Sequence, residues 1–223
     1  INKNFIKNGL HRIIVKEGLY VDILIQGITT EFIETNNNKV LVCFSGAVNR
    51  SKVPKGPFFS GLTMGKNLNV PIIAISDPTL ALDDNLDVSW YAGNELSPNL
   101  QKEVSIFLDF ISKALNKELV LFGGSAGGFS CLVQATLLTT KAIVFVWNPQ
   151  TDIEKYSKNF VDQYITTAFP KKKKIIGISD VTQLEINENI RLVYFQNYDD
   201  WHLKSHMVPF FTRFKLSFKN DFF

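Results

Sequence analysis

The stretch LVLFGGSAGGFSCLVQATLL, residues 119–138, decides the fold. A short apolar run is followed by two glycines, a serine, an alanine and two more glycines, and then by a second, longer apolar run. A short apolar run bounded by glycines is typical of a buried strand, and the longer run is typical of a helix. The stretch therefore predicts a strand, a sharp turn at Ser125 and a helix.

The glycines around Ser125 satisfy the pattern Gly-x-Ser-x-Gly between Gly123 and Gly127. On such a turn the serine takes a strained backbone conformation, and side chains two positions before or after it would collide with the neighbouring strand or helix. The hydroxyl then emerges at the carboxyl end of the sheet, where a helix begins and N–H groups are free. We interpret the stretch as a nucleophile elbow with Ser125 as the nucleophile.

Two other glycine motifs fit this stretch less well. A phosphate-binding loop has the same spacing from Gly123 to Gly128, but Phe129 stands where that loop needs a lysine. The dinucleotide pattern Gly-x-Gly-x-x-Gly fails because Ser125 and Ala126 occupy glycine positions. A turn that only lets a helix pack closely on a strand remains the structural alternative.

Apolar patterning around this stretch predicts an α/β fold. Strands are expected at 12–26 (two strands around a turn at 16–18), 40–44, 71–76, 119–122, 142–147 and 190–196, and helices at 99–115, after Ser125, at 153–169 and after Pro209. Continuous apolar strands that alternate with helices indicate a parallel sheet buried on both faces. We predict one domain over 1–223, a three-layer sandwich with an N-terminal antiparallel hairpin, which could be a piece of a longer protein.

With a hairpin first, an elbow after a middle strand and histidines near the end, most of the chain resembles the α/β-hydrolase superfamily. The resemblance implies a serine esterase, lipase, peptidase or acyltransferase, with no metal or diffusible cofactor. It also places the general base on the loop after a late strand, before the last helix. His202 occupies that position, and His206 is the second choice; His11, the remaining histidine, is expected at the surface.

The acid of the catalytic group is chosen from several aspartates. The superfamily order of serine, acid and histidine favours Asp200. Asp200 is only two residues from His202, which is an awkward geometry, and it suits His206 better than His202. Three alternatives stay open, namely Asp199, which forms an Asp-x-x-His pair with His202, and also Asp152 and Asp180. The resemblance further assigns the oxyanion hole to the N–H of Ala126 and to the loop FSGAVNR, where Ala47 is the candidate donor after Gly46.

Other polar and aromatic residues follow predicted strands and could line a pocket for a sugar or another polar substrate, although core packing explains the tryptophans equally well. They are Trp90, Tyr91, Trp147, Asn148 and Gln150. The segment 49–61 is rich in turn residues and is either a lid or an ordinary surface loop.

Composition excludes several other classes. The net charge is +3 and the basic residues are scattered, which argues against a nucleic-acid partner; the run of lysines at 171–174 is expected to be a solvated loop. Cys43 and Cys131 lie in apolar segments and are expected to be reduced core residues of a cytoplasmic protein. The longest uncharged stretch, 119–140, is interrupted by glycines, so no transmembrane segment is expected. The oligomeric state is not determined by the sequence.

These observations lead to one main hypothesis and two alternatives. We expect an acyl-ester hydrolase that acts on a small-molecule or glycan ester through an acyl-enzyme on Ser125. A glycan O-acyltransferase, such as an O-acetyltransferase, would use the same residues. A non-catalytic binding module would keep only the fold.

Overall fold

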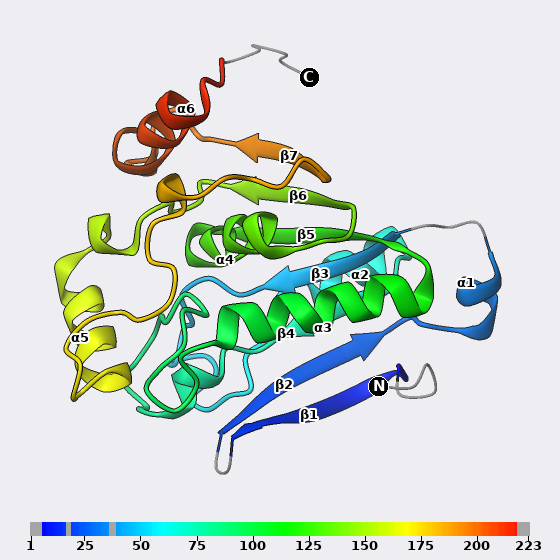
Figure 1. Cartoon of the computed structure of the whole chain (residues 1–223). Helices are drawn as coiled ribbons and strands as arrows, with labels where there is room; N and C mark the ends of the chain where they lie inside the picture. The colour runs from blue at the N-terminus through cyan, green and yellow to red at the C-terminus, as the bar shows by residue number, and fades with distance from the viewer. Residues whose placement is uncertain (1–5, 17–18, 36–38, 218–223) are drawn as a thin grey trace.

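The computed structural model describes residues 6–16, 19–35 and 39–217 (Figure 1). One seven-stranded sheet has the order β1-β2-β4-β3-β5-β6-β7. Its strands are β1 (Gly9–Lys16), β2 (Leu19–Gln26), β3 (Lys39–Phe44), β4 (Ile72–Ile75), β5 (Glu118–Gly124), β6 (Ala142–Trp147) and β7 (Ile190–Phe195). The pairs from β4 to β7 are parallel, whereas β1 pairs with β2 and β2 with β4 in antiparallel fashion. The predicted α/β fold with an antiparallel N-terminal hairpin is confirmed.

Helices cover both faces of this sheet, as predicted. Figure 1 shows α3 (Leu100–Leu115) and α4 (Ser125–Leu137) in front of the strands and α2 (Leu62–Leu68) behind them. The front face holds the main core, to which α6 (Val208–Phe214) adds Phe210 against Tyr194 of β7. Behind the sheet, a smaller core forms where α2 packs near Cys43 and Ile72. Cys43 and Cys131 are both buried and unpaired, and burial raises the pKa of the Cys43 thiol to about 12.

Several helix boundaries differ from the prediction. Two short helices, α1 (Thr30–Glu34) and α2, were not expected, because each has too few residues to show a helical repeat. The helix predicted at 153–169 is split into a 3₁₀ turn, Ile153–Lys155, and α5 (Lys158–Ala168). The split occurs because Asp152 caps the N–H of Glu154 and Tyr156 adopts an extended conformation.

The C-terminal helix also begins and ends earlier than predicted. A π-helical turn, Leu203–Met207, precedes α6, and Lys215 ends α6 in the left-handed region at φ 52°. Residues 17 and 18 of the turn predicted at 16–18 lie outside the described residues, as does the chain after 217.

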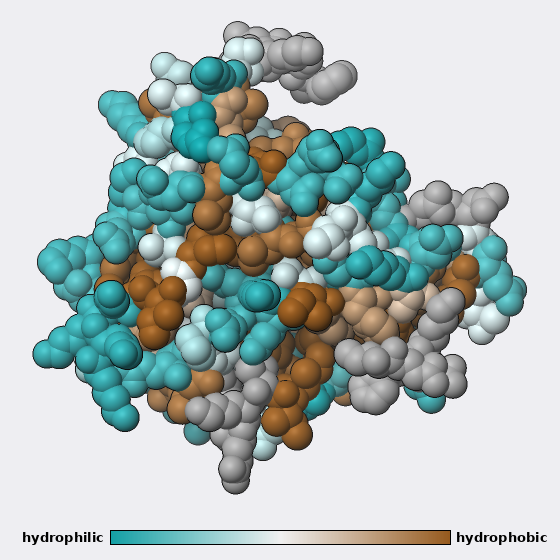
Figure 2. All heavy atoms as spheres, viewed as in Figure 1, coloured by the Kyte–Doolittle hydropathy of each residue, from teal (hydrophilic) through white to brown (hydrophobic). Residues whose placement is uncertain are grey.

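The surface of the described residues is mixed. Figure 2 shows hydrophobic side chains over α3 and the hairpin below it, where Leu10, Ile14 and Ile106 are exposed. The lysines at 171–174 are exposed on a loop, as expected. Among the described helices, none is both long and apolar enough to span a membrane.

Candidate active site

Ser125 follows the last residue of β5 and begins α4 with a left-handed backbone, at φ +50°. A Cβ on Gly123 would lie 2.5 Å from the carbonyl carbon of Gly127, and one on Gly127 would lie 2.5 Å from the carbonyl oxygen of Phe44. Real side chains do not approach backbone so closely, so both positions require glycine for the steric reason inferred from the sequence. A non-glycine residue with positive φ stores strain of about 1–3 kcal/mol and is typical of functional turns.

His202 and Asp200 form a pair on the loop after β7. The Asp200 Oδ1 atom lies 2.5 Å from His202 Nδ1 and also accepts the backbone N–H of His202 at 2.8 Å. This local turn explains how two residues only two positions apart can pair, and it directs Asp200 to His202 rather than to His206. Because a carboxylate only accepts, Nδ1 carries the hydrogen and the lone pair of the neutral ring is on Nε2.

The charge of Asp200 is stabilised where it lies. Partial burial opposes ionisation, but hydrogen bonds from the backbone and ring of His202 outweigh that cost and lower the pKa of the carboxyl. Asn148, which follows β6, donates to Asp200 Oδ2 at 3.0 Å and accepts the N–H of Asn197 at 2.7 Å. Asn148 therefore contacts the acid of the pair and fastens the loop after β7 to the loop after β6.

Gln150 connects the serine to this pair. Its side-chain Nε2 donates to Ser125 Oγ at 3.0 Å and lies 3.4 Å from His202 Nε2. Its Oε1 accepts the indole N–H of Trp90, and its backbone N–H donates to the carbonyl of Ser125 at 3.2 Å. The structure thus brings Ser125, His202 and Asp200 together, although within the described residues the serine and the imidazole are joined through Gln150 rather than directly.

His206 is held away from this chemistry. It is fully buried, and its Nδ1 accepts the backbone N–H of Thr151 at 3.2 Å, so the ring hydrogen is on Nε2. Nε2 has no hydrogen-bond partner among the described residues. Burial, followed by the nearby charges of His202 and Lys155, lowers the His206 pKa to about 4. No contact among the described residues links the His206 ring to Ser125, directly or through Gln150, so His206 is poorly placed to serve as its base.

The three alternative acids have other roles in the described structure. Asp152 accepts the N–H of Glu154, and Asp180 accepts the N–H of Thr182, so each closes a local turn. Asp199 is exposed beyond the pair. None of the three contacts a histidine ring in the part of the chain described here.

The loop after β3 lies against the elbow. A Cβ on Gly46 would be 3.3 Å from the carbonyl oxygen of Gly124 and 4.0 Å from Ser125 Cβ. On either side, the N–H of Ser45 donates to the hydroxyl of Tyr91 and the N–H of Val48 donates to the carbonyl of Asp87. The N–H of Ala47, between them, has no partner among the described residues. Ala126 is in the first turn of α4, where N–H groups lack intrahelical partners.

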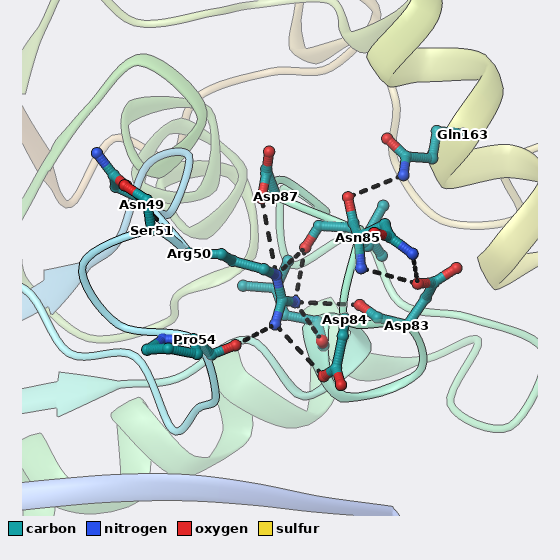
Figure 3. Close-up of polar contacts among 11 residues, drawn as sticks. Asn49, Arg50, Ser51, Pro54, Asp83, Asp84, Asn85, Asp87 and Gln163 are labelled. Carbon is teal, nitrogen blue, oxygen red and sulfur yellow. Dashed lines mark hydrogen bonds and ion pairs between the residues drawn. The ribbon is translucent and has the colours of Figure 1, made fainter.

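Arg50 fastens this loop to the segment 80–87, as Figure 3 shows. Its guanidinium donates to the carbonyls of Leu80, Asp83 and Leu86 and to that of Pro54. Asp84 and Asp87 lie within 3.7 Å of its nitrogens, and only 11% of the side chain is exposed. We call this set of contacts the Arg50 clamp. It ties down part of the segment 49–61, which the sequence left open as a lid or a surface loop.

Sequence reasoning missed two residues near the site. The Arg50 clamp could not be recognised from the sequence, because its acceptors are backbone carbonyls, which every residue provides. Trp201 packs against His202 with ring centroids 4.1 Å apart and the rings tilted by 32°, and its position between Asp200 and His202 was the available clue. Among the expected pocket residues, Trp90 and Tyr91 are buried, while Trp147 is half-exposed and packs on Phe122.

No protein-family model matches the sequence, and no curated protein matches it either. The fold is similar to that of the capsule O-acetyltransferase of Neisseria meningitidis serogroup A, with a TM-score of 0.67 at 16% identity over 96% of this chain and 87% of that one. Carboxyl esterase 2 of the fungus Tuber melanosporum matches with a TM-score of 0.58 at 12% identity, over 94% and 71% of the two chains. A lipase/esterase of Lactobacillus plantarum matches with 0.55 at 10% identity, over 94% and 87%. The chain has an α/β-hydrolase-type fold.

Proposed function

We propose that this protein is a serine acyl-ester hydrolase that works through an acyl-enzyme on Ser125. The observation that carries the proposal is the strained elbow serine facing a hydrogen-bonded His202–Asp200 pair through Gln150. A serine hydroxyl needs such a base to attack a carbonyl at neutral pH. The names of the three similar structures, all acyl-transfer or ester-cleaving enzymes, support the same class.

In the first half-reaction, His202 Nε2 takes the proton of Ser125 as Oγ bonds to the carbonyl carbon. The N–H groups of Ala126 and Ala47 then hold the oxyanion, and Asp200 stabilises the imidazolium. Collapse of the intermediate breaks the bond to the leaving alcohol oxygen, which receives the proton from His202. A water molecule repeats these steps and releases the acid. The contact between serine and imidazole is expected to tighten when substrate binds.

Transfer to a sugar hydroxyl instead of water is the second candidate. It is favoured by the likeness to the capsule O-acetyltransferase, which spans nearly the whole of this chain. A variant of that enzyme has been solved in complex with CoA, so acetyl-CoA is the first donor to test.

Labelling with a fluorophosphonate tests the class. We expect one adduct per chain, located on Ser125 by peptide mass spectrometry, and none in the Ser125→Ala variant. A folded protein that gains no adduct under conditions that fully label a control esterase would leave only a non-catalytic binding module. Acetate released into water, compared with acetyl groups transferred from acetyl-CoA to added oligosaccharides, then distinguishes hydrolase from transferase.

A further inference from the structure

Gln150 contacts both groups that would exchange a proton in the proposed reaction. The sequence offers it only as one of several pocket residues, whereas the structure places its amide nitrogen 3.0 Å from Ser125 Oγ and 3.4 Å from His202 Nε2. The following inference rests on the proposed function and concerns that same site.

The chemistry of its partner fixes which end of the carboxamide faces the serine. The Trp90 indole N–H is a donor only, so the atom that it contacts must be the amide oxygen. The NH₂ end therefore points towards Ser125 and His202. Its two hydrogens match two acceptors, namely the lone pairs of the serine oxygen and the unprotonated Nε2 of the neutral imidazole.

The carboxamide is also held rigidly. Gln150 is fully buried, and its backbone N–H is bound to the carbonyl of Ser125. Trp90 is buried as well and packs edge-on against Tyr156 and Tyr164. A donor that is already oriented in a buried site needs no reorganisation when charge appears beside it, which is the condition under which such donors contribute most.

We propose that Gln150 is a further catalytic residue, a preorganised donor to Ser125 Oγ, oriented by Trp90. During attack, the Oγ–H bond breaks, the proton moves to His202 Nε2, and the electron pair on Oγ forms the bond to the acyl carbon. During deacylation, the same oxygen leaves the acyl carbon with that pair and takes the proton back from His202. In both steps Oγ carries partial negative charge, which the N–H of Gln150 stabilises.

Gln150→Glu tests this role with little change of shape. The carboxylate still accepts from Trp90, but it cannot donate to Ser125, and its charge favours the imidazolium form of His202. We expect the rate constant for fluorophosphonate labelling at pH 8 to fall at least ~10-fold. The acid limb of the pH–rate profile should move to higher pH, by roughly one unit. That shift follows from the added charge alone, so the role of the donor is tested by the labelling rate of an uncharged variant.

Gln150→Met removes the donor without adding charge, and we expect a fall of at least ~10-fold in the labelling rate. Trp90→Phe keeps the glutamine donor but loses the N–H that orients it, together with part of a buried ring, so a smaller fall in labelling rate and a lower melting temperature are expected. Gln134→Met is the matched control, because Gln134 is a buried glutamine that donates to Gln101. It should lower the melting temperature without lowering the labelling rate of folded protein.

The outcomes separate this inference from the proposed function. If wild-type protein labels on Ser125 while folded Gln150→Met labels at the wild-type rate, Gln150 is not catalytic and the enzyme class stands. If wild-type protein does not label at all, the proposed function fails, and the inference fails with it.

Discussion

The serine side and the histidine side of the candidate site are built in different ways. The serine lies in a continuous strand, turn and helix. A side chain at Gly123 would collide with Gly127, and one at Gly127 would collide with the end of the neighbouring strand β3. The histidine side is a loop fastened from outside. Asn148 and Thr151, both from the loop after β6, bind the Asp200 carboxylate and the buried His206 ring.

This difference teaches which part of a site can be recognised from local sequence. The steric requirements of a nucleophile elbow fall on a few consecutive residues, so a short sequence pattern is enough to recognise it. A loop held by distant carbonyls and amides carries no such pattern. Substitutions on the serine side should therefore lower the stability of the fold, whereas substitutions on the histidine side should affect activity and stability separately.

The largest effect on the labelling rate is expected at the proposed base, His202. His202→Gln should lower acylation by at least ~10³-fold, because removal of the general base leaves only binding and the oxyanion donors. His206→Gln should retain most of the activity per folded molecule. The measurement is the rate of fluorophosphonate labelling at pH 8. Equal losses of labelling rate in the two variants would contradict the assignment of a chemical role to His202 and a packing role to His206.

On the serine side, substitution of an elbow glycine should destabilise the folded protein. Gly127→Ala introduces a carbon only 2.5 Å from the Phe44 carbonyl oxygen, and overpacking of this kind costs about 1–3 kcal/mol. The free energy of urea unfolding, compared with that of the wild type, measures this cost. If Gly127→Ala is as stable as the wild type, the close approach at the elbow does not determine the turn.

The sequence predicted most of the sheet for a physical reason. Strands such as Ile72–Ile75 are buried along their whole length, and a continuous apolar run is the direct signature of that environment. The short helices α1 and α2 and the break near Tyr156 depend on capping contacts and packing that no periodicity reveals. Boundaries were therefore less predictable than the elements themselves.

The candidate site shows the same division. Ser125 was singled out by its glycines, and Asp200 and His202 by their place after β7. That Asp200 faces His202 rather than His206 depends on a turn closed by the His202 N–H, which the spacing alone did not favour. The position of Gln150 against Ser125 depends on Trp90, which lies 60 residues away along the chain.

A third prediction uses acid to separate the two histidines. The folded protein lowers the His206 pKa from its ordinary value near 6.5 to about 4. Between these two pH values the unfolded chain binds a proton that the folded protein does not, so stability is complete above about pH 6.5 and falls as the pH drops to 4. The loss is on the order of 3 kcal/mol.

His206→Gln should lack this part of the acid destabilisation, as measured by urea unfolding at pH 7.5 and pH 4.5. His11→Gln is the matched control for loss of a histidine, because His11 lies on the hairpin. If His206→Gln loses as much stability as the wild type between these pH values, burial of the neutral ring is not the source of the acid dependence.

The smallest effect on the labelling rate is expected at the Arg50 clamp. It supports the loop after β3, a part of the site in addition to the serine side and the histidine side compared above. Arg50 acts on the loop that carries Ala47 by binding carbonyls, and a lysine ammonium cannot reach all of them with the same planar fork. Arg50→Lys should cost about 1–2 kcal/mol of stability and slow labelling of Ser125 only a few-fold. Arg191→Lys is the control, since Arg191 is exposed and pairs only with Glu118 within the described residues. If the Arg50 variant loses stability but keeps the full labelling rate, the clamp supports the fold alone and the Ala47 loop is positioned by the contacts of Ser45 and Val48.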